Sequence, residues 1–234
     1  MHRRRPLMVA VMAFVLIVHG IAGQAADRPG LVVDDPQGDA VWPLDTSLNA
    51  AWADLTTFRV AGVRDDDGEV VALQFVYVTA EPPRDDDEHR VFFTTGWELY
   101  DGVNPWCSAS LWVYDGRPGG PWGPPRADLY YSCDGDDKPG HLYLDLKLVR
   151  ARVSIRLGGP DGTVTPMREG SAMVVTVPLS AFATGLSQGR YTEGTTLTSL
   201  YATSGVLWRF MGIGMDGAGG GLLQGRPFAY TIGT

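Results

Sequence analysis

Alternation of apolar and polar residues recurs along most of this chain, and this pattern constrains the fold more than any other feature. Between residues 56 and 232 it is punctuated by turn segments rich in Gly, Pro and Asp. Successive side chains of a strand point to opposite faces, so a two-residue period indicates β-structure. No segment of the mature chain keeps a 3.6-residue period over three turns. The sequence therefore predicts an all-β protein, an antiparallel two-sheet β-sandwich.

The clearest strand is expected at residues 69–79, where both faces are apolar, which predicts a central strand covered on both sides. Asp-Gly at positions 67–68 predicts a hairpin turn to the preceding strand at 56–63. At 141–157 the alternation changes phase at Leu148-Val149, which indicates one long strand with a β-bulge. Further strands are expected at 90–100, 108–114, 128–132, 172–177, 197–204, 206–211 and 228–232, with one helical turn at 179–184.

The N-terminus has the three parts of a secretory signal. Residues 2–5 are basic, residues 7–22 are mostly apolar, and small residues flank Gln24 at the expected cleavage site near Ala25. The apolar run is short for a membrane span, although an uncleaved anchor is the alternative. We expect residues 1–25 to be a signal peptide and residues 26–234 to form a single secreted domain without a transmembrane segment.

Cys107 and Cys133 are the two cysteines, and export predicts that they pair rather than remain buried thiols. If the strands at 108–114 and 128–132 form a hairpin, residues whose numbers sum to 240 face one another. Trp112 then faces Asp128 and Cys107 faces Cys133. The sequence thus predicts a disulfide-linked hairpin insertion, whose bridge would contribute about 3 kcal/mol by restricting the unfolded chain.

Charge and motifs argue against several functions. The formal net charge of −8 argues against nucleic acid or anionic lipid as partner. Residues 185–189 match the nucleophile-elbow pattern around Ser187, but no histidine follows them and the surroundings indicate a loop. His89 and His141 lack ligands at zinc spacing. Most carboxylates lie in hydrophilic runs, unlike the paired acids of glycosidases. We therefore expect a protein that is not an enzyme.

An acidic turn opens the domain, with Asp34, Asp35 and Asp39 around Pro-Gln-Gly. Calcium takes six to eight oxygen ligands, and three carboxylates on one turn could supply some of them. A solvated turn that keeps the protein soluble is the alternative interpretation.

Eight aromatic residues cluster between positions 97 and 131. Trp112 and Tyr130 lie within expected strands and are assigned to the core. Trp106 and Trp122 instead lie beside Pro or Gly, in segments typical of surface loops. An exposed tryptophan either binds a ligand, such as the flat face of a sugar ring, or packs on its own hairpin.

Several short motifs resemble one family. They are Asp34-Asp35-Pro-Gln-Gly-Asp39, residues 54–60 before a long strand, residues 174–182, residues 200–204, and Asp216-Gly-Ala before residues 228–232. Together they resemble the DOMON-like sandwiches related to carbohydrate-binding family 9, which are modules of exported bacterial proteins. The resemblance implies a jelly-roll-like sandwich, an aromatic sugar site, and structural calcium held by Asp34, Asp35, Asp39 and Asp216.

The prediction is a secreted, non-catalytic module that binds carbohydrate. The candidate ligand-binding residues are Trp106, Trp122, Tyr100 and Tyr131. The alternatives are a cell-surface protein-interaction or structural domain without a small ligand, and a haem-binding DOMON-type redox module that would use Met211 or Met215 with His141.

Overall fold

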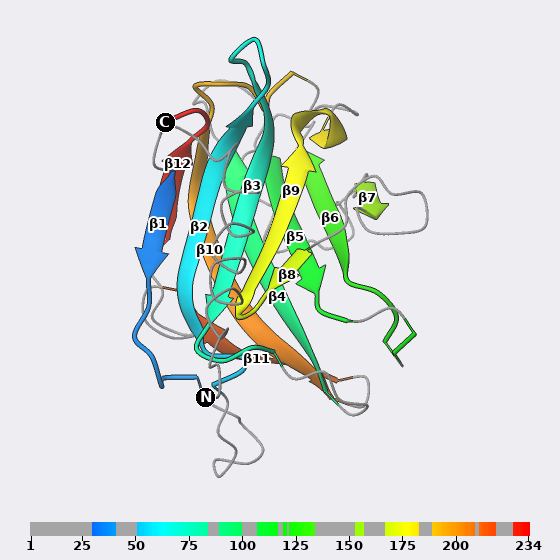
Figure 1. The fold of residues 1–234 in the computed structure, drawn as a ribbon. Coiled ribbons are helices and arrows are strands. Elements are labelled where there is room, and N and C mark those ends of the chain that lie inside the picture. The colour runs from blue at the N-terminus through cyan, green and yellow to red at the C-terminus, as the bar shows by residue number, and fades with distance from the viewer. Residues whose placement is uncertain are drawn as a thin grey trace, which may run out of the picture.

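The computed structural model of the 234-residue chain is all-β, as predicted, with two antiparallel sheets (Figure 1). It describes residues 30–40, 51–83, 89–99, 107–116, 119–120, 122–133, 153–156, 167–182, 189–208, 211–218 and 227–234. Within these ranges no helix is long and apolar enough to cross a membrane. The signal peptide expected at residues 1–25 lies outside them.

The smaller sheet has five strands in the order β1-β2-β3-β9-β8. They are β1 (Leu31–Asp34), β2 (Leu55–Arg64), β3 (Val70–Thr79), β9 (Ala172–Pro178) and β8 (Met167–Glu169). The larger sheet has seven strands, in the order β11-β10-β4-β5-β6-β7 with β12 also paired to β10. They are β11 (Met211–Gly217), β10 (Thr196–Trp208), β4 (His89–Leu99), β5 (Cys107–Tyr114), β6 (Arg126–Cys133), β7 (Val153–Arg156) and β12 (Phe228–Thr231).

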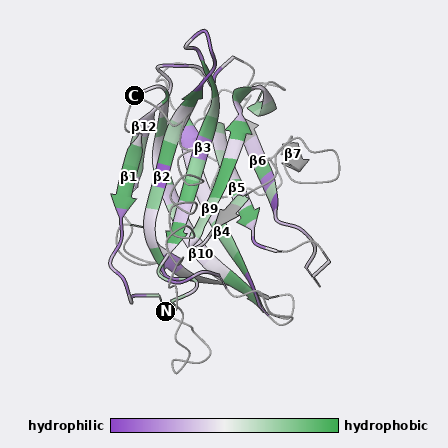
Figure 2. Ribbon diagram, viewed as in Figure 1, coloured by the Kyte–Doolittle hydropathy of each residue, from purple (hydrophilic) through white to green (hydrophobic). Residues whose placement is uncertain are grey.

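The core lies where inward side chains of the two sheets meet. Phe75 of β3 stacks on Trp97 of β4, with ring centroids 5.5 Å apart. Tyr77 stacks on Phe93 at 4.9 Å, and its hydroxyl lies 2.6 Å from Thr95 Oγ1. Figure 2 shows apolar residues along the strands and hydrophilic residues at the β2–β3 turn.

The β2–β3 turn forms as predicted from Asp-Gly. Gly68 has φ +85°, a conformation that side chains disfavour, and its amide donates to the Asp65 carbonyl at 3.0 Å. β3 is central, as expected. On its second face, Val70 and Ala72 are buried, whereas Val76 and Val78 are half-buried.

Other differences concern strand ends. Residues 197–204 and 206–211 were expected as two strands, but β10 runs through Gly205, which pairs with Phe92 of β4. β1 and β11 were not predicted. The turn at 179–184 is the 3₁₀ helix η2 (Leu179–Phe182). The bulge expected at Leu148-Val149 lies outside the described residues. Of the segment 141–157, the structure describes β7.

The β5–β6 hairpin has the predicted register. Trp112 faces Asp128 and Cys107 faces Cys133 across the ladder. This places the two cysteines where a disulfide requires them, close together on neighbouring strands. The bridge itself stays a prediction.

Candidate functional site

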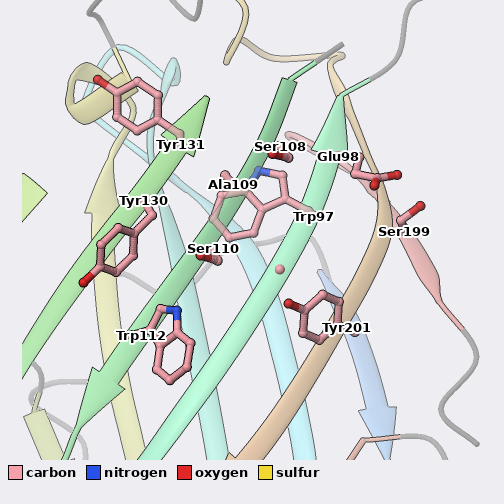
Figure 3. Close-up of a pocket in the computed structure, with 11 residues that line it drawn as sticks. Trp97, Glu98, Ser108, Ala109, Ser110, Trp112, Tyr130, Tyr131, Ser199 and Tyr201 are labelled. Atoms are coloured by element: carbon pink, nitrogen blue, oxygen red, sulfur yellow. The ribbon is translucent and has the colours of Figure 1, made fainter. Parts of the chain in front are cut away.

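A groove of about 470 Å³ lies against the larger sheet, over strands β10, β4, β5 and β6 (Figure 3). Strict alternation in β5 creates part of it. Leu111 and its inward neighbours are buried, whereas Ser108, Ser110 and Trp112 are only half-buried on the opposite face. The groove is lined by Gly96, Trp97, Glu98, Ser108, Ala109, Ser110, Trp112, Tyr130, Tyr131, Ser199 and Tyr201.

Three aromatic side chains from different strands stand around this groove. Tyr201 of β10 is 45% exposed, and it is one of four exposed large hydrophobic residues among those described. Trp112 of β5 and Tyr130 of β6 are half-buried. The Trp112 ring stacks on the buried Phe92 ring at 5.6 Å, which fixes its orientation on the sheet. The groove therefore has preorganised flat apolar walls.

Gly96 makes room for an aromatic ring in the middle of the groove. It pairs with Tyr201 on one side and with Ser110 on the other. A Cβ atom at Gly96 would collide with the Tyr201 ring, so that ring lies directly over the glycine. The Ser110 hydroxyl is shielded from solvent and has no hydrogen-bond partner within the described structure.

The polar end of the groove has an irregular backbone. Ser199 has φ 50°, and it is the non-glycine residue with positive φ among those described. The pairing of β10 with β4 shifts between Thr198 and Tyr201, which marks a β-bulge. Bulges and strained residues persist where the fold fixes them and are frequent at functional sites. Here the irregularity separates Ser199 and Glu98 from the aromatic walls.

The same sheet face beyond Trp112 is closed by a cation–π cluster. The guanidinium groups of Arg90 and Arg126 lie 5.2 and 4.8 Å from the Tyr114 ring centroid. Arg90 donates to the carbonyls of Asp115 and Pro124 and so holds the β5–β6 loop. Burial, and then the charge of Arg126, lower the pKa of Arg90 to about 10. The guanidinium therefore stays protonated at neutral pH and can hold both carbonyls.

A second candidate site is acidic. Asp35 follows β1, Asp39 lies in the next turn, and Asp216 lies in β11, yet one carboxylate oxygen of each lies within 4.8 Å of the others. Asp216 is fully buried, and its carboxylate accepts hydrogen bonds from the amides of Leu55 at 2.6 Å and Gly217 at 2.7 Å. This carboxylate ties β11 to the start of β2.

The carboxylates of this acidic cluster repel one another. Burial, with the charges of Asp35 and Asp39, raises the pKa of Asp216 to about 7. Asp54 is also buried, and burial followed by the charge of Asp39 raises its pKa. Its Oδ2 accepts from the Gly38 amide at 2.7 Å, while Oδ1 of Asp54 and Oδ1 of Asp39 are buried and have no hydrogen-bond partner among the described residues. Such carboxylate oxygens fit a hard divalent cation such as calcium.

The structure brings together three of the four acids that the family resemblance singled out. Asp34 is the exception. It is exposed, and Thr57 donates to its carboxylate at 3.3 Å, away from the cluster. Asp54 was not predicted, because its role depends on the turn at Gly38 folding back over it.

The four aromatic residues predicted to bind the ligand differ in where they lie. Tyr100 and Trp106 lie outside the described residues. Trp122 is half-buried in the β5–β6 loop and does not line the groove. Tyr131 lines the groove but is only 4% exposed, with its ring 5.9 Å from Phe182 in the core.

Sequence reasoning missed the aromatic walls. Trp112 and Tyr130 were assigned to the core, and this was wrong, because both belong to the half-exposed phase of their strands. The available signal was the alternation itself. In β5, Trp112 shares its phase with Ser108 and Ser110, and a tryptophan in a polar phase indicates a functional surface.

Comparison of the chain with protein-family models, with curated proteins and with solved structures found no match. The resemblance to DOMON-like modules therefore stays a prediction, and function has to be argued from the groove and the acidic cluster.

Proposed function

We propose that this protein is a secreted, non-catalytic module that binds carbohydrate in the groove on the larger sheet. The observation that carries the proposal is the arrangement of Trp112, Tyr130 and Tyr201 around Gly96, over which the Tyr201 ring lies. Sugar rings combine an apolar face with hydroxyl groups at the edge. The aromatic walls would stack on that face, and the serines and Glu98 would bind the hydroxyl groups.

The groove runs across the strands, which favours an extended oligosaccharide over a single sugar. From Tyr201 on β10 to Tyr130 on β6 the path crosses three strand spacings, or about 14 Å. A chain lying along this path would contact both tyrosines and the indole between them.

The proposal includes the wider setting of the site. The two sheets would form a jelly-roll-like sandwich of the DOMON-like kind, with the β5–β6 hairpin closed by a Cys107–Cys133 disulfide. Residues 1–25 would direct export. Calcium would be held by Asp35, Asp39 and Asp216, where it would neutralise buried charge and join β1, β2 and β11.

Depletion of the protein by insoluble polysaccharides tests the binding function. Trp112→Ala should reduce retention about ten-fold or more, because a flat stacking surface is lost. Trp122→Ala is the matched control, since it removes a half-buried tryptophan outside the groove and should leave retention unchanged. Loss of retention only in Trp122→Ala would move the site to the loop. Failure of the wild-type protein to bind any polysaccharide would contradict the function.

A further inference from the structure

The charge that lines the groove narrows the class of carbohydrate, and this inference rests on the proposed function. Among the described residues that line the groove, Glu98 is the one that carries a formal charge near neutral pH. The others are aromatic residues, serines, glycine and alanine. A groove of this kind is electrostatically matched to a cationic ligand and disfavours uronic acids or sulfated sugars.

Glu98 lies at a defined place relative to the stacking surfaces. It is two residues from Gly96 on β4 and therefore on the same face of the sheet. Thr198 and Ser108 lie opposite it on the two neighbouring strands, and Thr198 Oγ1 donates to its main-chain carbonyl at 3.0 Å. Figure 3 shows its carboxylate beside Ser199, at the end of the groove away from Trp112.

Among the described residues, Arg90, Arg126 and Asp128 lie on this face beyond Trp112. Arg126 Nε lies 3.9 Å from Asp128 Oδ2, and Arg90 is buried under the β5–β6 loop. Glu98 is the acidic side chain in the described lining of the groove, and the chain as a whole carries a net charge of −8.

We infer that the groove selects a saccharide with a free amine, a hexosamine unit whose ammonium group pairs with the Glu98 carboxylate while a neighbouring ring stacks on the aromatic walls. The ammonium would donate to a carboxylate on the sheet and would also lie near electron-rich ring faces, which favour a cation. Neutral sugars would bind more weakly by the same stacking.

Calorimetric titration of three β-1,4-linked tetrasaccharides tests the inference at about pH 6, below the pKa of an ordinary amine. The probes are the oligomers of glucosamine, N-acetylglucosamine and glucose. The wild-type protein should bind the glucosamine oligomer about five-fold more tightly than the other two. Glu98→Gln should abolish that preference, because the amide carries no charge but can still hydrogen-bond a sugar hydroxyl group. Glu81→Gln removes an exposed carboxylate outside the groove and should keep the preference.

The outcomes separate this inference from the proposed function. Equal or tighter binding of the neutral oligomers, or a preference that survives Glu98→Gln, would overturn the inference and leave a neutral-sugar module. Absence of binding to all three oligomers, together with no retention on insoluble polysaccharides, would overturn both.

Discussion

The groove and the acidic cluster are both candidate ligand sites, but they are built in opposite ways. The groove lies against a sheet face, where the Trp112 ring stacks on Phe92. The acidic cluster is buried where β1, β2 and β11 meet, and Asp216 there accepts two backbone amides. Substitutions in the groove should therefore change ligand affinity with little effect on stability, whereas substitutions in the cluster should change stability directly.

The largest effect is expected from Asp216→Ala. The substitution leaves the buried amides of Leu55 and Gly217 without acceptors and should lower the free energy of unfolding by about 4 kcal/mol. Urea denaturation of purified protein measures it. Asp34→Ala, which removes the exposed acid outside the cluster, is the control and should stay within about 0.5 kcal/mol of the wild type. Equal effects of the two substitutions would contradict the separate role of the cluster.

The pH dependence of stability without calcium should be large and of unusual sign. The folded pKa of Asp216 is raised from an ordinary 3.8 to about 7, so the folded state holds this proton more tightly than the unfolded state. The contribution is complete below about pH 4 and is lost as the pH rises to about 7, a loss of about 3 kcal/mol. Denaturation in EDTA at several pH values measures it.

Calcium should remove that loss, because a bound cation favours the ionised carboxylate. A stability profile in EDTA that rises between pH 4 and 7 would contradict the raised pKa. Identical profiles with and without calcium would argue against a cation in the cluster.

Reduction of the disulfide should weaken the hairpin that carries Trp112. If Cys107 and Cys133 are bridged as their register allows, reduction should lower the free energy of unfolding by about 3 kcal/mol. Mass spectrometry of the unreduced protein after proteolysis should detect the linked peptide. Two alkylatable thiols in the native, oxidised protein would contradict the bridge.

The smallest effect on stability is expected from Gly96→Ala. A Cβ atom would displace the exposed Tyr201 ring, which has room to move, so the free energy of unfolding should change by less than about 1 kcal/mol. The same substitution should weaken carbohydrate binding about ten-fold, because the ring leaves its stacking position. Calorimetry and thermal denaturation together measure this separation. A large loss of stability with unchanged affinity would reverse the comparison between the two sites.

The two sites also differ in how far the sequence could predict them. The β5–β6 register followed from strand alternation and one hairpin, because both depend on neighbours in sequence. The Asp35 and Asp39 part of the cluster was visible for the same reason, as one turn. Asp216 came only from a family resemblance, and Asp54 was missed. Their place depends on contacts between β11, β2 and the turn after β1, which no local pattern encodes.

The groove was the hardest feature to predict. Tyr201, Gly96 and Trp112 lie on three strands that become neighbours only when β10 pairs with β4. The continuity of β10 through Gly205 was itself hidden, since glycine ordinarily weakens a strand. Because the sequence does not reveal that pairing, the binding site was predicted at Trp106 and Trp122, which are flanked by Pro or Gly.

The binding of carbohydrate in the groove is tested most directly by the NMR signals of the tryptophan indole N–H groups during titration with a soluble tetrasaccharide. Trp112→Phe and Trp122→Phe assign the two signals. We expect the Trp112 signal to shift in a saturable manner, while the Trp122 signal stays unchanged. A saturable shift confined to Trp122, or no shift under conditions where the protein is retained on polysaccharide, would contradict the groove as the binding site.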